Sequence, residues 1–386
     1  LTKLYIFKSN KRKKNFLNKK NIILFDTFLI KSMFEKNIYF DRYYSFYLNN
    51  LNKEQKQRLF FLPILFNNSL SLKNIRLFSK NNNFILHTDF INFIDYVKIL
   101  VIFFKFYFYR IKNFSYKGIN LKNLIDQEIK EKSLNHSFLI SILTFYTFKN
   151  LKKFNANIAT CVDWFENQIV DKSLNYSVKK FFPKTKLKSY MGTNLDLNIS
   201  DFLVPSQIEK KNNLIADEMF LINHDNKRYF KKIFPKNRIK TAPAFRNQNI
   251  YNYSKKIKVN KKDLNILVVF TASHLDNLKM IKTLNSFSKI MCKKLNFTLR
   301  FHKNSEIYKV ITFLDKKIKF KISKNETIYK LLQNSKCVIC RPGTISLEAA
   351  IFDVPIILTR RIFGILPIKM SSILKRDFCY ENDEIE

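Results

Sequence analysis

The chain has 386 residues, 46% of them hydrophobic, which is enough for two domains with apolar cores. This excludes a wholly disordered chain, and only 4 Gly and 8 Pro exclude collagen-like and linker-like sequences. Lys and Arg number 70 against 30 Asp and Glu, and the net charge of +40 favours anionic partners. Lys, Asn, Ile and Phe are all abundant, as A/T-rich codon usage would give, so codon preference explains much of this charge.

Five cysteines form an odd, sparse set, which indicates a reducing cytoplasm and not a disulfide framework. The run Cys337-Val338-Ile339-Cys340 is typical of a buried strand, and no second Cys/His pair gives it the spacing of a zinc site. We therefore expect no metal site and no cofactor.

Residues 1–150 alternate short apolar runs with helix-like stretches at 91–110 and 121–149, and they contain no recognisable motif. No apolar run is long enough to span a membrane, and residues 1–20 do not resemble a signal peptide. In the stretch 91–110, apolar residues recur at helical spacing beside lysines. This favours a core helix with snorkelling lysines, and the alternative is a helix lying on an anionic membrane surface.

From residue 154 onward, short apolar runs alternate with helical patterns, which predicts parallel sheets. In the first half we expect a helix at 166–181 and strands at 156–162, 186–191, 201–204 and 218–222. In the second half we expect helices at 275–293, 326–334 and 345–352, and strands at 264–270, 297–302, 318–322, 336–341 and 355–359. The prediction is an α/β protein with two doubly wound, Rossmann-like domains facing a cleft, where ligands bind at the carboxyl ends of strands.

The domain boundaries follow from a polar, basic segment without clear periodicity at 247–263, which we interpret as a linker. It separates an N-terminal domain, 1–246, from a C-terminal domain, 264–386.

The most informative segment begins at Cys340, where a strand leads through a turn at Gly343 into a helix whose first turn offers the hydroxyls of Thr344 and Ser346 to a bound donor. Unpaired backbone N–H groups at a helix N-terminus bind anions, and Glu348, one turn further on, could accept hydrogen bonds from a sugar diol. The alternative is that Gly343 makes an ordinary turn, Thr344 caps the helix and Glu348 complements the helix dipole.

This segment resembles the nucleotide-binding motif of GT-B glycosyltransferases through Ser346-Leu347-Glu348-Ala349-Ala350 and Asp353-Val354-Pro355-Ile356-Ile357. Further segments are similar, in order, to those of bacterial capsule and surface-carbohydrate proteins, although Ala242 and Lys303 stand where glycine and proline are usual. They are Trp164-Phe165-Glu166-Asn167-Gln168, the stretch 184–192, Pro205-Ser206, Ala242-Pro243-Ala244-Phe245-Arg246 and Arg300-Phe301-His302-Lys303. The resemblance covers 156–357, about half of the chain.

The resemblance implies a metal-independent glycosyltransferase with a GT-B-like fold, and no Asp-x-Asp motif suggests a metal. It assigns the donor phosphates to Gly343 and Thr344 and the ribose to Glu348. Arg300, His302 and Lys303, at a strand end, are suited to neutralising phosphate. Thr271 and Ser273 follow another strand, where they either contact the donor phosphate or cap the next helix.

Sugar transfer with inversion requires a base near the acceptor hydroxyl. Glu166 and Asp163 are the candidates, because both follow the strand predicted at 156–162. The alternatives are that Glu166 is only a carboxylate in the first turn of a helix and that Asp163 is its N-cap.

We therefore expect transfer of a sugar from a nucleotide-sugar donor to a surface polysaccharide or lipid-linked acceptor, in the cytoplasm or at the inner membrane. A sugar-nucleotide epimerase or a polyol-phosphate transferase would share the same two-domain frame. A non-catalytic basic protein that binds nucleic acid or anionic membrane is a third class. Nucleic acid is disfavoured as a partner because no helix-turn-helix, zinc finger, RNP motif or GXXG loop is present.

Overall fold

The computed structural model describes residues 9–29, 33–35, 38–39, 41–65, 83–133, 135–193, 201–247, 250, 265–291, 295–302, 307–324, 326–359 and 379–382. The chain divides into two compact units. The first comprises Leu1–Thr193 and Phe202–Arg246, and the second comprises Asn194–Asp201 and Asn247–Glu386. Most of the linker predicted at 247–263 lies outside the described residues. No helix in the described ranges is both long and apolar enough to cross a membrane.

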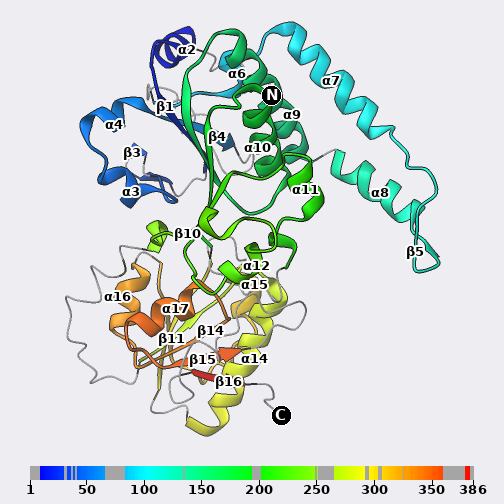
Figure 1. Ribbon diagram of the computed structural model, residues 1–386. Helices are drawn as coiled ribbons and strands as arrows, with labels where there is room; N and C mark the ends of the chain where they lie inside the picture. Colours follow the sequence, from blue (N-terminus) through cyan, green and yellow to red (C-terminus); the bar gives the residue numbers. More distant parts are fainter. Residues whose placement is uncertain are drawn as a thin grey trace. The chain divides into compact units, whose positions relative to one another are not determined.

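The first unit is built on a parallel sheet with the strand order β10-β9-β8-β7-β1-β4 (Figure 1). Read from β4 to β10 and numbered along the chain, this order is 2-1-3-4-5-6. The direction in which successive strands are added to the sheet reverses between β1 and β7. Ligands of doubly wound sheets bind beyond the carboxyl ends of strands at such a switch point. The strands are β1 (Ile22–Leu29), β4 (Leu59–Leu65), β7 (Ile158–Trp164), β8 (Lys186–Met191), β9 (Glu218–Leu221) and β10 (Ile239–Thr241).

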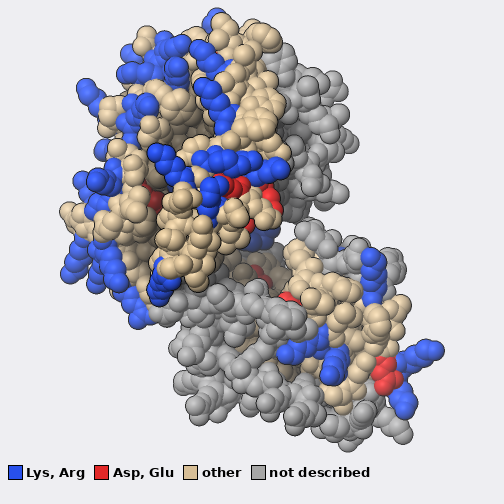
Figure 2. Space-filling model, turned by 90° about the vertical axis from the view of Figure 1, so that its right-hand side faces the viewer, with Lys and Arg blue, Asp and Glu red and all other residues tan. Residues whose placement is uncertain are grey.

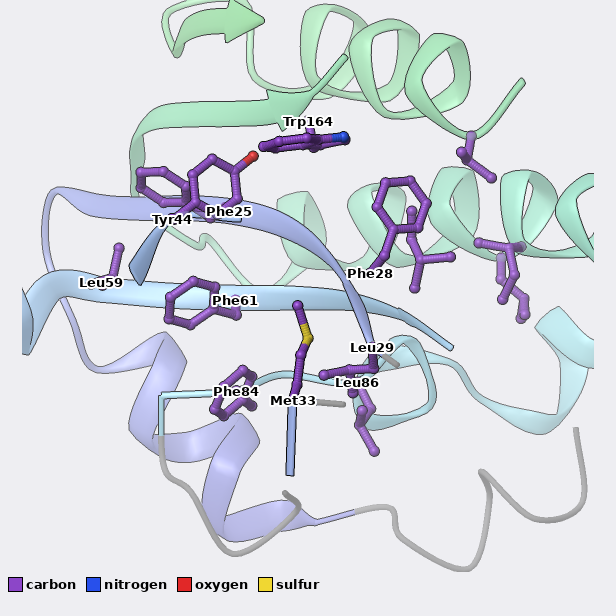
Figure 3. Close-up of a cluster of buried hydrophobic side chains, with 14 of the residues drawn as sticks. Phe25, Phe28, Leu29, Met33, Tyr44, Leu59, Phe61, Phe84, Leu86 and Trp164 are labelled. Carbon is purple, nitrogen blue, oxygen red and sulfur yellow. The ribbon is translucent and has the colours of Figure 1, made fainter. Parts of the chain in front are cut away.

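The central strand β1 reads IILFDTFL and is almost entirely buried, as expected for a parallel strand covered on both faces. On one face, Phe25 and Phe28 pack with Phe61 of β4, Tyr44 and Trp164 (Figure 3). Residues from the part of the sequence without motifs therefore supply two strands of this sheet and much of its core.

Ten helices are described in the first unit. They are α2 (Asn10–Leu17), α3 (Ser45–Asn49), α4 (Lys53–Arg58), α6 (His87–Phe90), α7 (Phe93–Tyr107), α8 (Lys122–Ser133), α9 (His136–Lys153), α10 (Ile169–Phe181), α11 (Gln207–Lys211) and α12 (Lys227–Phe230). Short hairpins are formed by β2 (Phe34–Glu35) with β3 (Ile38–Tyr39) and by β5 (Ser115–Tyr116) with β6 (Ile119–Asn120). Single 3₁₀ turns occur at η2 (Asp201–Leu203), η3 (Lys236–Arg238) and η4 (Phe245–Asn247).

Two elements of the first unit differ from the prediction. The helical stretch at 121–149 is divided into α8 and α9, because the Asn135 side chain caps α9 by accepting a hydrogen bond from Ser137 N. The strand predicted at 201–204 is instead the 3₁₀ turn η2, since Pro205 and the N-cap residue Ser206 of α11 follow at once and leave no room for a paired strand.

The helix α7 is not a core helix, so the favoured prediction for this stretch was wrong. Only Asp95 and Ile99 are buried, and Phe93 is 80% exposed. One face packs on α9, where the rings of Phe106 and Phe138 lie 4.5 Å apart. In Figure 1 α7, α8 and β5 project from the rest of the first unit.

The second unit is a parallel sheet with the strand order β13-β12-β11-β14-β15-β16. Along the chain this is 3-2-1-4-5-6, the Rossmann order, with its switch point between β11 and β14. The prediction of two Rossmann-like α/β domains is confirmed. The strands are β11 (Asn265–Val269), β12 (Asn296–Arg300), β13 (Phe320–Ile322), β14 (Cys337–Cys340), β15 (Ile356–Thr359) and β16 (Cys379–Asn382), and the helices are α14 (His274–Met291), α15 (Ile307–Ile311), α16 (Ile328–Gln333) and α17 (Thr344–Ile351).

Candidate functional site

Glu166 lies just after β7, at the switch point of the first sheet, and its carboxylate is held by two donors. Trp164 Nε1 donates to Oε1 at 2.9 Å, and Gln168 Nε2 donates to Oε2 at 2.8 Å. The side chain is half-buried, so it is fixed in position and still reaches the surface. A carboxylate held in this way is a fixed hydrogen-bond acceptor at the surface.

Aromatic rings surround the Trp164 indole, which is fully buried. Its ring centroid lies 4.4 Å from that of Tyr43 and 5.4 Å from that of Tyr190. The Tyr190 hydroxyl donates to Pro243 O at 2.8 Å and accepts from Phe245 N at 3.2 Å. Tyr190 therefore fastens the segment 242–246 beside Trp164.

Tyr43 and Arg246 join this site, and the sequence interpretation missed both roles. Burial raises the pKa of the Tyr43 hydroxyl, and the cations of Arg246 and Arg42 oppose the shift while Glu166 adds to it. The side chains of Tyr43, Arg246 and Glu166 are thus within electrostatic reach of one another. Tyr43 lies in the part of the chain without motifs, so no local pattern singled it out.

Gly192, at the end of β8, is required by close packing. A Cβ atom at this position would overlap the Trp164 ring, with three ring carbons inside van der Waals distance. Asn167 adopts a φ of 53°, a left-handed conformation that asparagine tolerates better than most residues. Its side chain donates to Phe202 O at 2.8 Å, so the turn between β7 and α10 is tied to η2.

Asp163 does not lie at this surface, which corrects the expectation that it faces a cleft. It belongs to β7 itself, is 0% exposed and accepts from Asn175 Nδ2 at 2.8 Å. Successive side chains of a strand point to opposite faces, and this one points into the interior. The helix α10 begins at Ile169, and its capping carboxylate is Asp171, so Asp163 is not an N-cap and Glu166 lies outside the first turn.

Asp163 is instead one of three buried carboxylates, with Asp26 of β1 and Asp171 of α10. Each has one oxygen without a hydrogen-bond partner. Burial raises the pKa of Asp163 to about 7 and raises the pKa of Asp26 well above its ordinary value, with the charges of Asp163 and Asp171 adding to the latter shift. The cluster therefore holds protons near neutral pH. Within the described ranges, no group of three or more His, Cys, Asp or Glu side chains is arranged to hold a metal ion.

In the second unit, the switch point between β11 and β14 brings together two of the predicted segments. Thr271 and Ser273 follow β11, and both hydroxyls bond within their own turn: Thr271 Oγ1 accepts from Ser273 N at 3.1 Å, and Ser273 Oγ accepts from Asp276 N at 3.3 Å. They thus cap the start of α14. Arg341 follows β14 and is buried, where it donates to Asp276 Oδ1 at 2.7 Å and ties the two segments together.

Gly343 precedes α17 as its N-cap, with an extended backbone (φ 170°) that any residue can adopt. The nearest atom to a Cβ placed there would be Arg341 O, at 3.9 Å, so the space beside the backbone is open. Thr344 is exposed, and Glu348 is half-buried one turn further along.

Ser346 is fully buried, which corrects the expectation that its hydroxyl is offered to a ligand. It donates to Gly343 O at 2.6 Å and accepts from Gly343 N at 3.2 Å. Arg300 is also engaged within the protein, since its Nη1 donates to Ser323 O and Lys324 O at 3.1 and 3.0 Å. His302 is exposed beyond β12, and Lys303 lies outside the described residues.

No family model matches this chain, and no curated protein matches it by sequence. Among solved structures, the UDP-GlcNAc 2-epimerase from Methanocaldococcus jannaschii aligns at a TM-score of 0.50 and 11% identity, covering 94% of this chain and 89% of that chain. A second UDP-N-acetylglucosamine 2-epimerase structure aligns at 0.50 and 11%, covering 90% and 80%. This likeness shows that the chain has a GT-B-like fold. A glycosyltransferase from Rickettsia africae ESF-5 aligns at a TM-score of 0.47 and 11% identity, covering 94% and 84%.

Proposed function

We propose that the protein is a metal-independent glycosyltransferase that moves a sugar from a nucleotide-sugar donor to a surface polysaccharide or a lipid-linked acceptor. The observation that carries the proposal is the segment Gly343–Glu348 at the switch point of a Rossmann sheet. Open space beside Gly343 lets a phosphate approach the backbone N–H groups at the start of α17. Glu348 lies one helical turn further along α17, and the resemblance to GT-B glycosyltransferases assigns the ribose to it.

Roles within the proposal follow from these surroundings. Gly343 and Thr344 contact the donor phosphates, and Glu348 accepts hydrogen bonds from the ribose. The turns around the donor are held by the contacts described above, which are made by Ser346, Arg300, Thr271 and Ser273. His302 and Lys303 complete the donor side, and Glu166 of the first unit acts as the base toward the acceptor hydroxyl.

A sugar-nucleotide epimerase is the second candidate function, since two structures that align at a TM-score of 0.50 are UDP-GlcNAc 2-epimerases. The two activities are separated by the need for an acceptor. A transferase consumes the nucleotide-sugar only when an acceptor is present, whereas an epimerase interconverts the nucleotide-sugar alone. We place the reaction in the cytoplasm at the inner-membrane surface, where a lipid-linked acceptor would be presented.

Nucleotide binding is tested by thermal unfolding with CMP, CDP, UDP and GDP. A ligand that binds only the folded state raises the unfolding midpoint by mass action, here by about 2–5 °C for one of the four nucleotides. Glu348→Ala should abolish that shift. Glu54→Ala removes an exposed carboxylate of the first unit and should retain it. A midpoint unchanged by all four nucleotides would contradict the donor assignment.

Glu166→Gln should reduce the rate of sugar transfer by about 10²-fold, because the amide cannot take up the acceptor proton. The amide oxygen still accepts from Trp164 Nε1, and the exposed Gln168 can turn its own amide oxygen toward the new NH₂ group, so the unfolding midpoint and its shift by nucleotide should stay close to wild-type values. Transfer is measured as nucleotide released in the presence of membrane lipid extract. Wild-type rates in this variant would remove Glu166 from the role of base.

A further inference from the structure

The projecting hairpin formed by α7, β5, β6 and α8 carries most of the exposed apolar surface of the described residues. The described residues include 21 exposed large hydrophobic side chains, and 14 of these lie between Phe93 and Leu124. Large contiguous apolar patches are rare on soluble monomers and mark interaction sites. The members with the greatest exposure are Phe93, Phe108, Ile119, Ile94 and Tyr116.

On α7 these side chains form one continuous stripe. Phe93, Val97, Val101, Phe104 and Phe108 recur at intervals of three and four residues, which places them on one side of the helix. They lie opposite the side that contains the buried Ile99. The stripe therefore faces away from the rest of the first unit.

The tip of the hairpin continues this surface. Lys117 and Gly118 both have positive φ, 49° and 80°, and join β5 to β6 in a two-residue turn. Tyr116 and Ile119, on either side of that turn, are 59% and 64% exposed. The Lys117 ammonium lies over the Tyr116 ring, 5.6 Å from its centroid.

The hairpin is a built element and not a loose end. Asp126 of α8 accepts from Ile111 N at 2.9 Å and from Lys122 Nζ at 2.7 Å, which closes the base of the turn region. Lys130 of α8 lies over the ring of Tyr107 of α7. The chain therefore uses specific contacts to present an apolar surface.

The stretch that carries the stripe and the tip is strongly basic, whereas the remainder of α8 carries the acidic residues Asp126, Glu128 and Glu131 together with Lys130 and Lys132. Between Phe93 and Leu124 the only acidic residue is Asp95, which is buried and bonds with Asn92 N and Asn150 Nδ2. Six basic residues occupy the same stretch: Lys98, Lys105, Arg110, Lys112, Lys117 and Lys122. Figure 2 views the molecule from the side on which the hairpin projects in Figure 1, and it shows Lys and Arg side chains beside uncharged surface.

We propose that the hairpin formed by α7, β5, β6 and α8 docks on an anionic lipid bilayer, with the stripe and the tip entering the headgroup region and the basic side chains contacting lipid phosphates. The helix α7 has 15 residues, a length of about 22 Å, so it lies in the interface and does not span the ~30 Å hydrocarbon core. A second copy of the hairpin would bring like charges together, and nucleic acid would leave the apolar stripe in water. An anionic bilayer satisfies both features at once.

This inference deepens the proposed function by naming the surface that holds the enzyme near a membrane acceptor. Flotation of the full chain with vesicles tests it in the absence of nucleotide and sugar, so a failure of docking is distinguishable from a failure of sugar transfer. We expect about tenfold more binding to vesicles of phosphatidylcholine with phosphatidylglycerol than to phosphatidylcholine alone. Added salt should weaken this preference.

The combined variant Val97→Ser, Val101→Ser, Phe104→Ser should reduce binding to the anionic vesicles about tenfold. The matched control Ile208→Ser, Phe313→Ser removes side chains that are 73% and 61% exposed elsewhere, and it should bind as the wild type. Two single tryptophan variants test docking if the serine variant fails to fold. Indole fluorescence of Phe104→Trp should shift to the blue on addition of anionic vesicles, and that of Ile208→Trp should not.

The proposal would be overturned if the wild-type chain did not float with anionic vesicles, or if a folded serine variant floated like the wild type. It would also be overturned if the hairpin mediated self-association, or RNA binding, in place of lipid binding.

Discussion

Replacing Gly192 with alanine should lower the free energy of unfolding of the first unit by about 3 kcal/mol. The new methyl group would overlap the Trp164 ring, which cannot retreat because Tyr43, Tyr44 and Tyr190 pack around it. A displaced indole would also lose its hydrogen bond to Glu166. Trp164 is the only tryptophan in the chain, so its fluorescence during urea unfolding reports this unit directly.

Gly343→Ala is the matched control for that experiment. Its backbone is extended and the space for a methyl group is open, so the expected change in the free energy of unfolding is within about 0.5 kcal/mol. A Gly192→Ala protein as stable as this control, with an unshifted native emission spectrum, would show that the indole has room to move.

The second large effect concerns pH. The native pKa of Asp163, about 7, lies above its ordinary value of 3.8, so the folded state binds a proton more tightly than the unfolded state. The contribution of Asp163 to the free energy of unfolding is therefore fully present below about pH 4 and decreases as pH rises toward 7. Asp163→Asn removes the dependence, and by pH 8 the variant should be more stable than the wild type by on the order of 3 kcal/mol.

Denaturant unfolding of both proteins at pH 5 and pH 8 measures the effect as a difference, which cancels the contributions of ionisable groups outside the cluster of Asp26, Asp163 and Asp171. The amide at position 163 would also offer a donor to the unpartnered Oδ1 of Asn175. Asp225→Asn makes the same chemical change at an exposed site and should not change the pH dependence. Equal pH dependence of the wild type and Asp163→Asn would contradict the buried position of the charge.

Strands in the interior of the two sheets could be predicted from sequence because parallel strands buried on both faces are continuous apolar runs. The expected 264–270 contains β11, and the expected 336–341 contains β14. The prediction failed where a local signal was weak, as at η2, or where a single capping residue decided a boundary, as at Asn135. It failed for α7 because apolar residues at helical spacing are the same for a buried helix and for an exposed one.

For the candidate sites, the order of predicted strands and helices indicated that Glu166 and Gly343 follow the ends of strands. In the structure they follow β7 and β14. The residues that surround them come from distant parts of the chain. Tyr43 packs against Trp164, and Asp26 accepts from Trp164 N at 2.6 Å across 138 residues. One signal was available, since Asp26 is a charged residue inside the apolar run of β1.

The position of β1 in its sheet has a consequence for synthesis of the protein. β1 is made before its neighbour β7, which follows about 136 residues later, as the bond from Asn21 N to Asn157 illustrates. Until that point the nascent chain exposes an apolar strand with one edge unpaired, a state prone to aggregation. Such distant pairing makes folding slow, and the first unit should reach its native state only after the strand that carries Trp164 has left the ribosome.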